Sequence, residues 1–124
     1  MDKQLIKIEN LIGQLTLLAL ALVLAVLLVM VAFHQWQMSD PYVKKVLSIS
    51  GDPIRGHAIF QMNCAGCHGL QADGRVGPSL QGVSKRKSSI GLIHQVVSGD
   101  TPPMPQFQPK PQEMADLLSY LEKI

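Results

Sequence analysis

Cys64-Ala65-Gly66-Cys67-His68 is the stretch that decides how this sequence is to be understood. The chain has only two cysteines among its 124 residues, and both lie in this stretch. A disulfide framework is therefore excluded, and the pair has to be explained by redox, metal or haem chemistry. The spacing puts both thiols on one turn of a helix, with the imidazole of the next residue beside them.

Cys-x-x-Cys-His is the attachment signature of c-type haem. Two thiols on one helical turn can reach the two vinyl groups at one edge of a porphyrin, and His68 then lies beneath the iron as its proximal ligand. Two other interpretations use the same residues. A thioredoxin-like dithiol would need a βαβ context, which residues 40–124 do not offer. A zinc site would need two more ligands, and His57 and His94 lack the paired spacing.

The residues around this motif occur in a recognisable order. They are a glycine and an aromatic residue before the motif, a Gly-Pro-x-Leu segment after it, a methionine in a proline-rich loop and an aromatic residue near the end: Gly56-x-x-x-Phe60, Gly77-Pro78-x-Leu80, Met104-Pro105 and Leu117-x-x-Tyr120. This order covers nearly all of residues 53–124 and resembles class I cytochromes c. The Asp40-Pro41-Tyr42 stretch and the run from Asn63 to Leu80 resemble, more narrowly, the membrane-anchored cytochrome M of cyanobacteria.

The resemblance implies an all-α fold, in which three to four helices surround one covalent haem c. Cys64 and Cys67 would carry the haem, and the carbonyl of Pro78 would accept a hydrogen bond from Nδ1 of His68, which fixes the tautomer of that ring. Gly56 would allow the first helix of the domain to approach the last one closely. Phe60, Leu117 and Tyr120 would fill the rest of this crossing. Leu80, Ile93 and Val97 would contact the haem.

Two further helices can be expected from periodicity. A middle helix should run from about Ser89 to Ser98 and end at Gly99. The last helix should begin with Pro111 at its first position and carry Glu113 in its first turn. Its apolar face would consist of Met114, Leu117, Leu118 and Leu121.

Methionine is a weak iron ligand that raises the haem potential, and Met104 is the best placed of the six methionines for that role. Met62 lies too close to Cys64, and Met114 fits the apolar face of the last helix. Met104 lies among three prolines, which lower the entropy cost of holding its sulfur in place. His94, on the middle helix, is the rival ligand, and an open sixth position is the third possibility.

An apolar run precedes the domain. Residues 17–33 contain no polar side chain, and together with residues 11–16 they make about 34 Å of helix, enough to cross a hydrocarbon core of about 30 Å. A cleaved signal peptide is the competing interpretation, because Lys3 and Lys7 supply a charged front. The run is longer than an h-region of about 7–15 residues, however, and no Ala-x-Ala-like site follows it. We therefore expect residues 1–38 to form a cytoplasmic tail and a retained single-pass transmembrane anchor.

Residues 39–52 would link this anchor to a haem domain spanning residues 53–124. Asp40-Pro41 is typical of an N-cap followed by proline at the first helical position, and Gly51 is a candidate helix end. A short helix is therefore expected in the linker, with the ring of Tyr42 at the headgroup region of the membrane.

Lysines do not orient the anchor, because Lys3 and Lys7 on one side balance Lys44 and Lys45 on the other. The haem motif indicates the orientation instead, because c-type cytochromes acquire their haem outside the bacterial cytoplasm. We expect a cytoplasmic amino terminus and a haem domain in the lumen or periplasm. The resemblance to cytochrome M implies a thylakoid or plasma membrane.

The expected function is to carry single electrons between membrane redox complexes, without catalysis and without a small-molecule substrate. The resemblance implies redox partners such as an oxidase or a photosystem. The net charge of +2 offers no general polycation for nucleic acid. Two alternatives stay open: a fixed cytochrome subunit of a respiratory or photosynthetic complex, and a haem enzyme or gas sensor with an open sixth position.

The densest basic cluster is Lys85-Arg86-Lys87, before the middle helix. It is either a solvated turn that keeps the domain soluble or a patch that steers an acidic partner.

Overall fold

The computed structural model describes residues 1–124 and is entirely helical, as predicted. The chain divides into two compact units, Met1–Gln37 and Met38–Ile124. In chain order the elements are the helices α1 (Asp2–Met38), α2 (Pro41–Leu47), α3 (Pro53–Asn63) and α4 (Ala65–His68), the 3₁₀ turn η1 (Val83–Lys85), and the helices α5 (Ser89–Ser98) and α6 (Pro111–Leu121).

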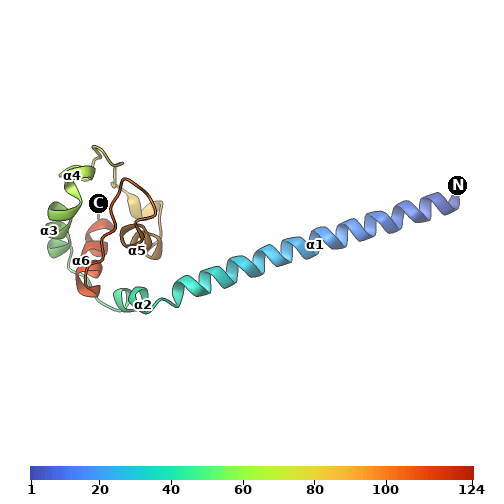
Figure 1. Ribbon diagram of the computed structural model, residues 1–124, viewed down its shortest axis with the longest axis horizontal. Coiled ribbons are helices and arrows are strands. Elements are labelled where there is room, and N and C mark those ends of the chain that lie inside the picture. Colours follow the sequence, from blue (N-terminus) through green and yellow to red (C-terminus); the bar gives the residue numbers. More distant parts are fainter. The chain divides into compact units, whose positions relative to one another are not determined.

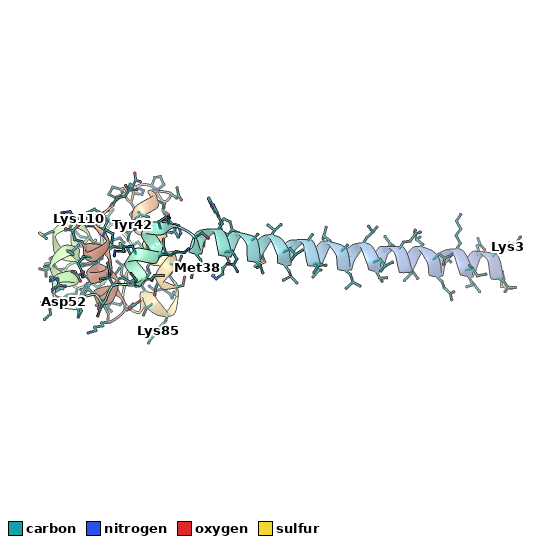
Figure 2. The ribbon with its side chains drawn as sticks, turned by 90° about the horizontal axis from the view of Figure 1, so that it is seen from below. Lys3, Met38, Tyr42, Asp52, Lys85 and Lys110 are labelled. Carbon is teal, nitrogen blue, oxygen red and sulfur yellow. The ribbon has the colours of Figure 1, made fainter.

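Helix α1 buries none of its residues, and its side chains project to all sides along its length (Figure 2). By length and composition it is the one helix in the chain that could cross a membrane. The apolar side chains of its central run are more than half exposed, for example Leu22 at 69%. The chain itself therefore provides no cover for this apolar surface.

Helix α2 begins as predicted, because the carboxylate of Asp40 accepts a hydrogen bond from the backbone N–H of Tyr42 at 2.8 Å. It ends at Leu47, so the expectation that Gly51 ends it is wrong. A Cβ on Gly51 would overlap the carbonyl oxygen of Ala115, so this glycine allows a close approach to α6 instead. The hydroxyl of Tyr42 donates to the carbonyl of Pro109 at 2.9 Å, which ties this ring into the compact unit.

Helices α3 and α6 pack side by side in the compact unit (Figure 1). The predicted role of Gly56 is confirmed, because a Cβ there would overlap the carbonyl oxygen of Asp116. Phe60 and Leu117 are fully buried in the crossing, and the rings of Phe60 and Tyr120 lie 5.2 Å apart. The predicted apolar face of α6 is buried throughout.

Helix α5 has the predicted bounds and the predicted end, since Gly99 adopts the left-handed conformation with φ +70°. The side chain of Ser88 caps its first turn by accepting from the backbone N–H of Gly91 at 3.2 Å. Helix α6 starts at Pro111 as expected, and the carboxylate of Glu113 accepts from the backbone N–H of Lys110 at 2.8 Å. Local capping residues therefore mainly determine where α5 begins and ends and where α6 begins.

Candidate functional site

The two cysteines lie at the junction of α3 and α4. The backbone N–H groups of Cys67 and His68 both donate to the carbonyl of Cys64, at 3.2 and 3.0 Å, which closes one helical turn around the motif. Both thiols are free; that of Cys64 is half-buried and that of Cys67 exposed. Burial, and secondarily the neighbouring Cys67, raises the pKa of the Cys64 thiol to about 11.

His68 is buried, with 8% of its surface exposed, and its ring is held from two sides. Its Nδ1 lies 2.8 Å from the carbonyl oxygen of Pro78, so the predicted hydrogen bond is confirmed. Because a carbonyl can only accept, Nδ1 carries the proton. Nε2 is left as the basic nitrogen that could bind iron.

The loop after α4 positions this imidazole, and Gly77 has a role there that the sequence did not reveal. A Cβ on Gly77 would come within 2.7 to 3.1 Å of three atoms of the His68 ring. The backbone N–H of Gly77 donates to the carbonyl of Cys67 at 2.7 Å, and that of Gly74 donates to the carbonyl of His68 at 2.7 Å. In the sequence, only the Gly77-Pro78 pair indicated that the backbone comes this close to the His68 ring.

Met104 is half-buried and packs against the core together with other residues expected at the haem, namely Cys64, Leu80 and Val97. Its loop is tied to α5, because the amide of Gln95 donates to the hydroxyl of Thr101 at 2.8 Å and lies 4.0 Å from the sulfur of Met104.

The other candidates differ in exposure. Ile93 is fully covered by protein atoms, whereas Leu80 and Val97 are partly exposed. Pro78 is exposed, although its carbonyl is used by His68. The rival ligand His94 has a buried Nε2 without a hydrogen-bond partner.

Asp116 is a buried carboxylate that sequence reasoning missed. It is 2% exposed and accepts from the backbone N–H of Asp52 at 2.8 Å, from Gln112 at 3.0 Å and from Arg55 at 2.9 and 3.2 Å. The hydrogen bond from Arg55 is the main reason why the pKa of Asp116 lies below its ordinary value. The only sequence signal was that this acid stands between the apolar residues Met114 and Leu117 of α6.

The arrangement fits a covalently attached haem and fits the alternatives poorly. Two free thiols on one turn lie beside an imidazole whose Nε2 is basic and whose ring is fixed by Gly77 and Pro78. A thioredoxin-like dithiol is disfavoured, because the chain has no strand and therefore no βαβ context. No group of three or more His, Cys, Asp or Glu side chains is placed to hold a metal ion such as zinc.

Comparisons with known proteins agree with this geometry. Residues 51–121 match the family model described as cytochrome C oxidase, cbb3-type, subunit III. The chain is 59% identical over 102 residues to a cytochrome c-553-like protein of Synechocystis sp., covering 82% of this chain and 97% of the relative. It is 31% identical over 101 residues to cytochrome c2 of Rhodopila globiformis, covering 60% and 94%. It is 28% identical over 100 residues to cytochrome c of Ginkgo biloba, covering 59% and 88%.

Proposed function

The chain belongs to the cytochrome c family, and from this premise we propose that it is a membrane-anchored carrier whose haem iron is held by His68 and Met104. Membership of the family makes it an electron-transfer protein with covalent haem c, not an enzyme. The similarity to the Synechocystis relative agrees with the resemblance to cytochrome M. The haem iron supplies the chemistry, which is to take up and give up one electron.

The residues of the chain supply attachment and position. Cys64 and Cys67 would form the two thioether bonds, each by addition of its S–H across one vinyl group of the haem. His68 would bind the iron through Nε2, and the carbonyl of Pro78 holds the opposite ring nitrogen, which keeps the imidazole oriented and raises its basicity. This hydrogen bond, on a ring packed flat against Gly77, is the observation that carries the proposal.

Met104 is proposed as the sixth ligand, with Leu80 and Val97 as apolar neighbours of the haem and Ile93 in the layer behind them. The support is that the Met104 loop is fastened to α5 through Gln95, which lowers the entropy cost of presenting the sulfur. One observation favours His94 as the iron ligand instead: its buried Nε2 has no hydrogen-bond partner. The Met104 proposal and the His94 alternative make opposite spectroscopic predictions.

The test is the near-infrared sulfur-to-iron band of the oxidised holoprotein. Met104→Ala should abolish this band and allow carbon monoxide to bind the reduced protein. Met62→Ala is the matched control, because Met62 is 76% exposed and its removal should leave the band intact. Persistence of the band in the Met104 variant would refute this ligand, and its loss in His94→Ala would identify the alternative site.

Anchoring by α1 is proposed from its length, its composition and its lack of any cover within the chain. The proposed domain assignment is residues 1–38 as tail and anchor, residues 39–52 as a connecting segment whose helix α2 packs into the compact unit, and residues 53–124 as the haem domain in the lumen or periplasm. Protease added from the cytoplasmic side of sealed vesicles should leave the haem domain intact. Digestion of the domain from that side would reverse the orientation.

The proposed partners are membrane redox complexes such as an oxidase or a photosystem, in a thylakoid or plasma membrane. One observation favours a second candidate: the matching family model is described as a subunit of a cbb3-type oxidase. A fixed subunit should co-migrate with other polypeptides after extraction in mild detergent, whereas a free carrier should run alone.

A further inference from the structure

Four lysines of the compact unit lie on two segments and form no ion pair: Lys44 and Lys45 on α2, and Lys85 and Lys87 before α5. All four are exposed. The structure has two ion pairs, and both of them use Arg55, so no carboxylate neutralises any of these lysines. We refer to the four residues as the lysine face.

A cavity of about 270 Å³ is lined by residues next to both segments of the lysine face. Leu47 at the end of α2 and Ser89 at the start of α5 both line it. The only acidic side chain in its wall is Glu122, whose carboxylate accepts from the hydroxyl of Ser89 at 2.8 Å. Leu47 is 42% exposed, so an apolar side chain lies beside the lysines.

Arg86 has a different role from its two neighbours. Its guanidinium donates to the carbonyl of Gln81 at 2.8 Å and to that of Ser79 at 3.1 Å. These bonds hold the turn in place and leave Lys85 and Lys87 projecting from it. The basic cluster seen in the sequence therefore consists of one structural cation and two free ones.

The position of α2 favours a lipid over a protein as the partner of the lysine face. Figure 1 places α4, which carries Cys67 and His68, at the opposite end of the compact unit from α2. A protein that exchanges electrons would have to approach the haem that Cys64 and Cys67 would carry, so it would gain little from docking at α2. In Figure 2, Lys85 and Met38 lie toward the same end of the unit, and Met38 is the last residue of the candidate membrane helix.

We infer that the lysine face docks on anionic headgroups of the membrane that α1 crosses. This inference rests on the proposed anchoring, which keeps the lysines within the thin layer where the surface potential acts. Each Lys near an anionic surface changes the ratio of docked to undocked domains by about fivefold. Docking would turn the end with α4 away from the lipid and keep it accessible to redox partners.

The test uses the full-length, haem-loaded chain in lipid nanodiscs that contain a headgroup fluorophore, whose emission the haem quenches at short range. Quenching should be stronger in discs of phosphatidylcholine with phosphatidylglycerol than in phosphatidylcholine alone, and added salt should weaken it. Replacing all four lysines of the face by Gln should abolish this dependence on lipid charge, and replacing them by Arg should retain it. The control is Lys110→Gln with Arg75→Gln, which removes the same kind of charge from exposed positions outside the face.

Equal quenching in both lipids for the wild type, or no change in the Gln variant, would overturn the inference. Slower reduction of the Gln variant by a partner, with its quenching unchanged, would also overturn it and assign the face to protein docking. Release of the wild type from the discs at alkaline pH would instead contradict the anchoring by α1. The two failures are therefore distinguishable.

Discussion

Helix α1 and the compact unit are both rich in leucine and valine, but they place these side chains in opposite environments. No residue of α1 is buried, whereas Phe60, Met114 and Leu117 of the compact unit have no exposed surface at all. A helix that is apolar all round and has no cover within its own chain needs lipid or another helix around it. A domain with a closed core depends on the precise fit of its own elements. The same type of substitution should therefore have different consequences in the two regions.

The largest effect is expected from charges placed in α1. Leu22→Arg with Val26→Arg should cost about 5–7 kcal/mol of membrane insertion free energy, since each Arg at the centre of a membrane helix costs about 2.5–3.5 kcal/mol. The variant should be released from membranes by alkaline washing. Any of this variant that matures with haem should have the wild-type haem spectrum, because α1 contributes nothing to the core of the compact unit.

The matched control is the same pair replaced by Ala, which keeps α1 apolar and should remain in the membrane. Release of this Ala variant, or retention of the Arg variant, would contradict the contrast between the two regions.

Glycine-to-alanine substitutions compare the two regions directly. Gly56→Ala should destabilise the compact unit by about 3 kcal/mol, because the new methyl group overlaps the backbone of α6 and forces the helices apart. Gly13→Ala in α1 and Gly66→Ala in the haem motif have nothing within 4 Å of the new Cβ and should be neutral or slightly stabilising. Denaturant unfolding followed by haem absorbance measures all three variants. Similar losses of unfolding free energy for Gly56→Ala and Gly66→Ala would show that α3 and α6 are not tightly packed at their crossing.

The contrast also explains what could be predicted from the sequence. The long apolar helix, the haem motif and the bounds of α5 were predictable, because each depends on residues close together in the chain. The role of Gly51 could not be predicted. A glycine after a short helix suggests a helix end, whereas Gly51 makes room for the carbonyl of Ala115. The hydrogen bond between Asp52 and Asp116 was equally invisible, since it joins residues 64 positions apart.

Asp116 should make the compact unit sensitive to acid. Because its folded-state pKa is lowered from 3.8, its contribution to stability is fully present above about pH 3.8 and is lost as the pH falls through the folded value. Asp116→Asn should therefore cost about 2 kcal/mol at neutral pH, and less as the solution is acidified. Asp100→Asn, at an exposed loop position, is the control. A difference between Asp116→Asn and the wild type that stays constant from neutral to acidic pH would refute this role.

The smallest effect concerns the boundary between the two regions, where residues 39–52 were expected to act as a linker. The hydroxyl of Tyr42 donates to the carbonyl of Pro109 at 2.9 Å, and Val43 and Val46 are 1% exposed, so α2 is packed into the compact unit. Tyr42→Phe removes one partly buried hydrogen bond and should lower the free energy of unfolding by about 1 kcal/mol. Hydrogen exchange should show faster opening of α2 in this variant, while α3 and α6 open as in the wild type. Ser48→Ala is the control, since the hydroxyl of Ser48 bonds only within its own turn, to the carbonyl of Lys45. If Tyr42→Phe were as stable as the wild type and its α2 exchanged at the wild-type rate, the hydrogen bond to Pro109 would contribute nothing to holding α2 in the compact unit.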